Sequence, residues 1–169
     1  MRDVADKLKE WAIQQKDDNK ADVFGRSAFN RYYYAVFLKT RKVIKRIHPD
    51  IGDIKHKEIP DIMRGKHISG KVENRIQHAK NKKRIDPEKF LYYKDTLKIS
   101  VETLSKLHTN AYDIRVKADY FPEVPIIREN NSITLNGQTL DEASKWPDQA
   151  VMIAGKILEI WGDEDLDPS

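Results

Sequence analysis

Apolar residues recur at helical spacing along the first part of the chain. Over about residues 2–16 they stand at i, i+4, i+7 and i+8, namely at Val4, Leu8, Trp11 and Ala12. A second stripe over about residues 20–47 comprises Val23, Phe24, Ala28, Tyr32, Ala35 and Leu38. This second segment is apolar on more than one side, because it also carries Phe29, Tyr33, Val36 and Phe37. The pattern predicts two helices, of which the second is central in a bundle.

A long helix is predicted over about residues 87–119. Asp86-Pro87-Glu88 supplies a cap and then proline at the first helical position. The main apolar stripe repeats every seven residues, at Phe90, Leu97, Leu104, Ala111 and Ala118. It is widened by Leu91, Val101, Leu107 and Ile114. Pro122, just beyond the last apolar position, stops the helix.

The stretch between the second and the long helix has a weaker pattern. Pro60 favours the first turn of a short helix, because proline fits that position. Ser69 is a candidate cap for a further turn that runs through Ile76. Gly65 and Gly70 interrupt any longer periodicity.

The last part of the chain mixes strand and helix signals. Residues 126–135 read as a small β-hairpin that turns at Asn130-Asn131, and Asn136-Gly137 marks a second turn. Thr139-Leu140-Asp141-Glu142 has the spacing of a capping box before a last helix that bends or restarts at Pro147. Its expected buried face comprises Ala150, Val151, Ala154, Ile157, Leu158 and Trp161. The acidic end, residues 163–167, is expected to fray.

These elements predict a mainly α protein, an up-and-down helical bundle with a small β-hairpin before the last helix. We expect one domain: a bundle over 1–122, the hairpin over 123–137, and the final helix with its acidic tail over 138–169. Hydrophobic residues make up 39% and charged residues 34% of the 169 positions, as in a soluble globular chain. There is no cysteine, no apolar run of about 18 residues and no signal-peptide core at the start. We therefore expect a cytoplasmic protein that does not enter a membrane.

Charge is unevenly placed along the chain. Residues 1–117 hold 28 Lys and Arg against 16 Asp and Glu, a balance of +12, whereas residues 118–169 hold 3 against 11, a balance of −8. One interpretation is a basic body that meets phosphate and an acidic part that masks it. The other is a solvated surface whose charges average out. The densest basic run comprises Lys80, Lys82, Lys83 and Arg84, which either grip a nucleic-acid backbone or only keep a loop soluble.

Familiar catalytic and cofactor motifs are missing from the sequence. It has no glycine-rich phosphate loop, no dinucleotide fingerprint and no His-Glu-x-x-His helix. Its five histidines are not paired at i, i+4 on one predicted helix. We expect neither a metal nor a cofactor.

Two predicted helices carry polar stripes on otherwise apolar faces. The earlier stripe comprises Ser27, Arg31 and Tyr34, and the later one comprises His108, Tyr112, Arg115 and Asp119. Buried polar groups need partners, so one interpretation is a buried network, for example Arg31 with Asp119. The other is a shared cleft in which Arg115 clamps phosphate, because its planar guanidinium is always charged.

The two polar segments together resemble the HEPN family, the higher eukaryotes and prokaryotes nucleotide-binding domain. The resemblance is carried by Ser27-Ala28-Phe29-Asn30-Arg31-Tyr32-Tyr33-Tyr34-Ala35 and by Ala111-Tyr112-Asp113-Ile114-Arg115-Val116-Lys117-Ala118-Asp119-Tyr120. It covers about residues 5–122 and implies a helical bundle that is commonly dimeric. Many members are metal-independent RNases of toxin or antiviral systems, with Arg, four to six residues and then His as their signature. Here Tyr120 stands where that histidine is expected, and no histidine follows His108.

The resemblance implies an RNA- or nucleotide-handling protein of a defence or toxin–antitoxin system. It is either a metal-independent endoribonuclease with an altered Arg-x4-Tyr site or a non-catalytic module. The module would bind RNA, a nucleotide or a partner such as a nucleotidyltransferase. A structural adaptor is the third interpretation. The candidate catalytic residues are Arg115, Asp119, Tyr120 and His108. The candidate RNA- or phosphate-binding residues are Arg31, Tyr34, Lys117, Lys80, Lys82, Lys83 and Arg84. We expect a homodimer.

Overall fold

The computed structural model describes residues 1–129 and 132–167. The chain is mainly helical, as predicted, with a small antiparallel sheet near its C-terminal third. It divides into two compact units, which are described separately: Met1–Leu38 with His108–Gln149, and Lys39–Leu107 with Ala150–Ser169. No helix in the described residues is both long and apolar enough to cross a bilayer.

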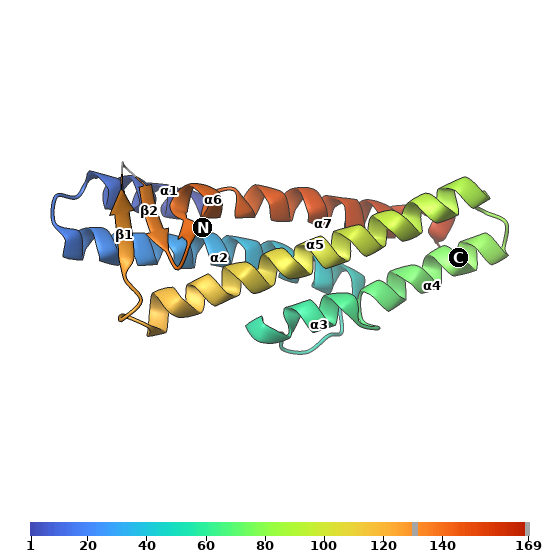
Figure 1. Ribbon diagram of the computed structural model, residues 1–169. Coiled ribbons are helices and arrows are strands. Elements are labelled where there is room, and N and C mark those ends of the chain that lie inside the picture. Colours follow the sequence, from blue (N-terminus) through green and yellow to red (C-terminus); the bar gives the residue numbers. More distant parts are fainter. Residues whose placement is uncertain (130–131, 168–169) are drawn as a thin grey trace. The chain divides into compact units, whose positions relative to one another are not determined.

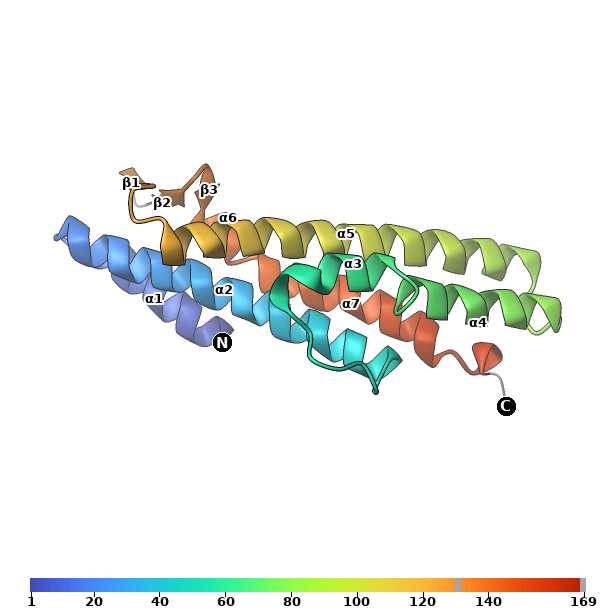
Figure 2. The same ribbon diagram turned by 90° about the horizontal axis from the view of Figure 1, so that it is seen from below.

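The first unit contains a pair of neighbouring helices and the sheet. Helix α1 (Arg2–Gln14) runs beside the N-terminal half of α2 (Asp18–Ile47) (Figure 1; Figure 2). The C-terminal half of α5 (Pro87–Tyr120) also belongs here. After α5 come β1 (Ile126–Glu129), β2 (Ser132–Leu135), β3 (Gln138–Thr139), α6 (Leu140–Ala143) and the start of α7 (Trp146–Gly162).

The sheet has strand order β1-β2-β3, with both neighbouring pairs antiparallel. The predicted hairpin is confirmed, with Ile126 opposite Leu135, although its expected turn at Asn130–Asn131 lies outside the described residues. The second turn is also confirmed, because Asn136 and Gly137 have φ of 50° and 78°, the positive values that a tight hairpin turn requires. The sequence did not predict β3, which this turn joins to β2.

The sheet packs closely on α2. A Cβ placed on Gly25 would lie 2.9 Å from the Cδ1 atom of Ile126 and 3.2 Å from the Cγ2 atom of Ile133. A larger residue at position 25 would therefore require the isoleucine side chains to shift. Ile133 and Leu135 are fully buried, so β2 supplies the apolar face of the sheet.

The start of the C-terminal helical region follows its sequence signal. Thr139 accepts a hydrogen bond from the backbone N–H of Glu142 at 3.1 Å, and the Glu142 carboxylate accepts one from the backbone N–H of Thr139 at 3.0 Å. The predicted capping box is confirmed. The predicted restart is confirmed as well, because α6 ends at Ala143 and α7 begins at Trp146, one residue before Pro147.

The second unit contains α3, α4 and the remaining parts of the long helices. The short 3₁₀ helix η1 (His56–Glu58) leads into α3 (Ile59–Arg64), which confirms the predicted short helix at Pro60. Helix α4 (Ser69–Asn81) runs beside the N-terminal half of α5 (Figure 1; Figure 2). Its N-cap is Ile68, and Ser69 donates to Glu73 at 2.9 Å, so the expected Ser69 cap is wrong.

Residues 163–167 of the acidic end form a defined structure, so the predicted fraying of these residues is wrong. This end forms the 3₁₀ helix η2 (Glu164–Leu166), in which Leu166 is buried. Arg75 donates to the carbonyls of Trp161 at 2.9 Å and of Leu166 at 3.1 Å. Lys89 Nζ lies 3.1 Å from Asp163 and 2.7 Å from Asp165. Arg75 on α4 and Lys89 on α5 therefore hold residues 163–167 in place. From composition alone, this polar segment was not expected to pack.

Several positions that the apolar stripes predicted to be buried are exposed. On α1 the fully buried residues are the small Ala5 and Ala12, whereas the larger Val4 and Trp11 are exposed. The exposed positions are Val4, Trp11, Val23, Leu38, Leu91 and Val151. Within the long helix the seven-residue stripe of Phe90, Leu97, Leu104, Ala111 and Ala118 is buried throughout, as predicted.

Candidate functional site

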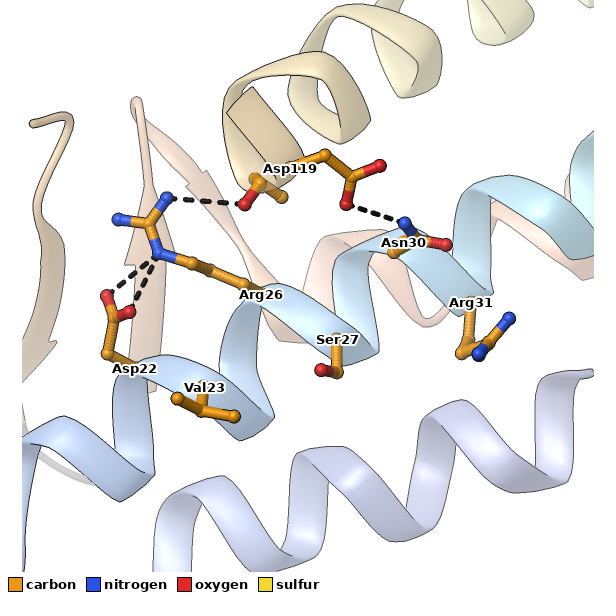
Figure 3. Close-up of a pocket in the computed structure, with 8 residues that line it drawn as sticks. Asp22, Val23, Arg26, Ser27, Asn30, Arg31 and Asp119 are labelled. Atoms are coloured by element: carbon orange, nitrogen blue, oxygen red, sulfur yellow. Dashed lines mark hydrogen bonds and ion pairs between the residues drawn. The ribbon is translucent and has the colours of Figure 1, made fainter. Parts of the chain in front are cut away.

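A pocket of about 330 Å³ lies in the first unit, between α2 and the C-terminal end of α5. Most of its lining comes from one side of α2, and the rest from the last turn of α5 (Figure 3). Its lining is mainly polar: Asp22, Arg26, Ser27, Asn30, Arg31 and Asp119, together with Val23 and Ala118. Ser27, Arg31 and Asp119 belong to the two predicted polar stripes, so the structure brings part of both stripes to one place.

Arg26 lines this pocket, and neither the apolar nor the polar pattern of the sequence singled it out. Its Nε donates to both carboxylate oxygens of Asp22, at 3.0 and 2.8 Å. Its Nη atoms donate to the backbone carbonyls of Lys117 at 3.3 Å, Phe121 at 3.3 Å and Val124 at 2.6 Å. A guanidinium at a helix C-terminus satisfies carbonyls that have no intrahelical partner and complements the helix dipole. Arg26 therefore holds the end of α5 and the following segment against α2.

Asp119 is held from two sides. Its Oδ1 accepts a hydrogen bond from Asn30 Nδ2 at 2.6 Å, and its Oδ2 lies 2.8 Å from Arg115 Nε. The predicted Arg31–Asp119 pair is wrong, because Asn30 takes that position (Figure 3). Consecutive helical residues point about 100° apart, and the Arg31 side chain turns away from the Asp119 carboxylate (Figure 3). Arg31 is exposed instead, and no other described residue forms a hydrogen bond or ion pair with it.

Arg115 pairs with Asp119 but is not among the residues that line the pocket. Its side chain is only 16% exposed, and its guanidinium carbon lies 5.2 Å from the centre of the Tyr120 ring. Burial by itself would lower the pKa of Arg115, but the charge of Asp119 and the hydroxyl of Tyr120 raise it above its usual value. Arg115 therefore stays charged and positions Asp119 and Tyr120. Tyr120 itself is 64% exposed.

His108 lies in the apolar core of the first unit. It is fully buried, with its ring 5.5 Å from that of Tyr33 and 6.4 Å from that of Phe37. Tyr33 is fully buried as well, and this burial raises the pKa of its hydroxyl. Tyr34 and Tyr112 are half-buried, and their rings lie 5.6 and 5.8 Å from the ring of Tyr33. This part of the predicted polar stripes is packed into an aromatic core away from the pocket lining.

The predicted basic run lies in the second unit, where α4 ends and the chain turns towards α5. Lys82 and Lys83 are exposed, and Lys83 has a φ of 56°. Lys80 places its ammonium 4.0 Å from the centre of the Phe90 ring. Arg84 is half-buried and donates to the backbone carbonyl of Asp167. Lys82 and Lys83 are thus the exposed cations of the run without a described partner.

The remaining candidate cation, Lys117, is half-buried on the last turn of α5, where its carbonyl accepts from Arg26. Within the described residues, no cluster of three or more His, Asp or Glu side chains could hold a metal ion. No protein-family model, no curated protein and no solved structure matches the chain. What the site can do therefore follows from its own residues.

The pocket combines groups that suit a phosphate next to a polar ring or sugar. Arg31 offers a guanidinium that no described residue neutralises, and Ser27 adds a hydroxyl. Asp119 accepts hydrogen bonds and is already oriented by Asn30 and Arg115. A fully anionic ligand alone would meet repulsion from Asp22 and Asp119, whereas a nucleotide presents phosphate to the arginine and N–H or O–H donors to the carboxylate.

Proposed function

We propose that this protein is a HEPN-like helical protein that binds RNA or nucleotides at the α2–α5 pocket. The observation that carries the proposal is the position of Arg31, an arginine without a described partner on a pocket whose other charges are already paired. Arginine binds phosphate through a planar fork of N–H donors. The resemblance of the Arg31 and Arg115 segments to the HEPN family supports a cytoplasmic defence or toxin–antitoxin role.

In this proposal three side chains of the pocket contact the ligand. Arg31 contacts a phosphate at the exposed side of the pocket. Asp119 accepts a hydrogen bond from a ribose hydroxyl or from a base N–H, while Arg115 and Asn30 hold its carboxylate in place. Ser27 donates or accepts a further hydrogen bond within the pocket.

Fluorescence polarisation of a labelled single-stranded RNA tests this proposal, with wild type, Arg31→Ala and Arg41→Ala compared. Arg41 is a matched control, because it is also exposed on α2 but lies outside the pocket. We expect Arg31→Ala to weaken binding roughly tenfold or more, as loss of a hydrogen-bonded ion pair does. Arg41→Ala should change the affinity much less. Equal losses in the two variants would mean that only general surface charge binds the RNA.

A second candidate function is metal-independent cleavage of RNA, which the neighbouring positions of Asp119 and Tyr120 favour. Cleavage needs a group that takes the proton of the 2′-OH, a donor near the leaving oxygen, and a cation on the phosphorane. Asp119, Tyr120 and Arg31 are the accessible groups of these kinds, and His108 is buried in the core. Incubation of the pure protein with total RNA in EDTA tests this function. Cleavage by wild type that is lost in Asp119→Asn would establish it.

We propose a homodimer, or a complex with a nucleotidyltransferase-type or other defence protein, on the strength of the family resemblance. Large apolar side chains exposed on α5 offer a surface for such a contact, among them Leu91 and Ile99. Light scattering at tens of micromolar distinguishes a monomer from a dimer.

A further inference from the structure

Two large aromatic side chains stand exposed at the end of α5, next to the pocket. Tyr120 is 64% exposed and Phe121 is 42% exposed. They directly follow Ala118 and Asp119, which line the pocket. Elsewhere in this unit the tyrosines of α2 are buried or half-buried, as is usual for large rings. The exposure of two consecutive rings beside a polar pocket indicates a contact surface.

The Tyr120 ring is positioned by a cation on one of its faces, the guanidinium of Arg115. The guanidinium of Arg115 lies 5.2 Å from the ring centre, within the distance of a cation–π contact. Arg115 is itself held by its ion pair with Asp119, and its side chain is largely buried. The ring therefore rests on a group that has little freedom to move.

The backbone that carries both rings is also anchored. Arg26 donates to the carbonyl of Phe121 at 3.3 Å and to that of Val124 at 2.6 Å. The backbone N–H of Phe121 in turn donates to the carbonyl of Lys117 at 3.2 Å. Because these bonds fix the last turn of α5, little conformational freedom is lost when a flat ligand settles on the exposed rings.

We propose that Tyr120, extended by Phe121, is a stacking platform for an unpaired base of single-stranded RNA. This inference rests on the proposed function, in which Arg31 and Asp119 hold the neighbouring phosphate and sugar or base edge. Stacking on aromatic rings is a common way to bind single-stranded nucleic acid, and it tolerates any sequence because every base has a π-face. Bases inside a duplex are already stacked on each other, so the platform selects unpaired nucleotides.

In RNA binding the role of Tyr120 is then assigned to its ring, and its hydroxyl is not needed for stacking. Replacement by Phe keeps the ring and removes the hydroxyl, whereas replacement by Ala removes both. Tyr92 offers a matched control, since it is 60% exposed on the same helix but belongs to the other unit. The three substitutions separate stacking from hydrogen bonding and from general loss of exposed aromatic surface.

The experiment measures binding of two labelled oligonucleotides by fluorescence polarisation: a short single-stranded RNA and the same backbone with abasic sites. We expect Tyr120→Ala to weaken binding of the RNA by about 5- to 100-fold, the range for one stacked base. Tyr120→Phe and Tyr92→Ala should bind it nearly as wild type does. The abasic strand should bind wild type and Tyr120→Ala equally weakly. Circular dichroism melting confirms that each variant is folded.

The outcomes distinguish this inference from the proposed function. If Arg31→Ala loses binding but Tyr120→Ala binds both strands as wild type does, the platform is overturned and the pocket proposal stands. If Tyr120→Phe is as weak as Tyr120→Ala, the hydroxyl is the contact and the stacking role is wrong. If wild type binds neither strand, both proposals fail together.

Discussion

Arg115 and Asp119 form an ion pair one turn apart on α5, with 2.8 Å between Arg115 Nε and Asp119 Oδ2. The Arg115 side chain is 16% exposed and the Asp119 side chain 23% exposed, and Asp119 as a whole residue reaches the surface. The pair lies between the pocket, which Asp119 lines, and the Tyr120 ring, which Arg115 contacts. It therefore links the two surfaces at which we propose that RNA binds.

Loss of this ion pair should reduce stability as well as binding. Arg115→Ala leaves the partly exposed Asp119 carboxylate with only Asn30 as partner. Removing one partner of a fully buried pair costs about 3–5 kcal/mol, and the partial exposure here lowers our expectation to about 2–3 kcal/mol. Urea denaturation measures this free energy. Stability equal to wild type would show that the pair is solvated and does not position Asp119.

The close packing of the sheet on α2 gives a prediction about two glycines. Gly25→Ala places a methyl group 2.9 Å from Ile126, whereas Gly155→Ala on α7 meets nothing within 4 Å. Alanine favours a helix by about 1 kcal/mol over glycine, so Gly155→Ala should stabilise the protein. Overpacking costs about 1–3 kcal/mol, so Gly25→Ala should be neutral or destabilising. Thermal melts that stabilise both variants equally would contradict this account of the sheet.

Docking of the acidic end should depend on pH. Burial raises the pKa of Asp163, but hydrogen bonds from Tyr93 and Lys89 outweigh it and bring the pKa below the ordinary 3.8. The ionised carboxylate therefore contributes stability that is present above about pH 3.8 and is lost as the pH falls through the lowered value. We expect the NMR methyl signals of Leu166 to report release of the segment in acid.

The same contact should also weaken at high pH, because Lys89 and Tyr93 lose their protons there. The hydrogen bond to Asp165 raises the pKa of Lys89, and burial with the hydrogen bond to Asp163 raises that of Tyr93. Their contribution is present below about pH 10 and is lost as the pH rises through the raised values.

Asp163→Asn is the control for the acid transition, since this variant should remove it. An unchanged acid midpoint in this variant would show that another group controls the release.

The basic run should contribute to RNA binding through Lys82 and Lys83, since the Lys80 ammonium contacts the Phe90 ring. The double variant Lys82→Ala, Lys83→Ala removes two exposed cations, whereas Arg84 is half-buried against Asp167. If both lysines contact phosphate, the slope of log affinity against log salt should fall in magnitude by about 1.4, or 0.7 for each contact on a single strand. Titrations at several salt concentrations measure the slope. The wild-type slope in the double variant would exclude the run from the interface.

Local signals in the sequence predicted much of the fold. The Asp86-Pro87 start of α5, the Asn136-Gly137 turn and the Thr139–Glu142 capping box each depend on neighbouring residues, and the structure confirms them. The ordered acidic end was missed because Arg75 and Lys89, which hold it, lie far away in the sequence.

The site was only partly predictable for the same reason. Helical spacing singled out Arg31, Arg115 and Asp119 as polar positions, but it could not decide which side chains pair. Nothing in the sequence marked Asn30 as the partner of Asp119, and its charged neighbour Arg31 was the more obvious candidate. Arg26 showed only an i, i+4 relation to Asp22, and its main contacts are backbone carbonyls about ninety residues later.

The most direct test of the central claim is a two-dimensional ¹H–¹⁵N NMR titration of the 19.7 kDa protein with a short single-stranded RNA. If RNA binds at the α2–α5 pocket, the largest shifts will fall on residues 27–31 and 117–121, and the Arg31 Nε–H signal will move with them. Shifts confined to residues 80–84, or no shifts at saturating RNA, would contradict the account.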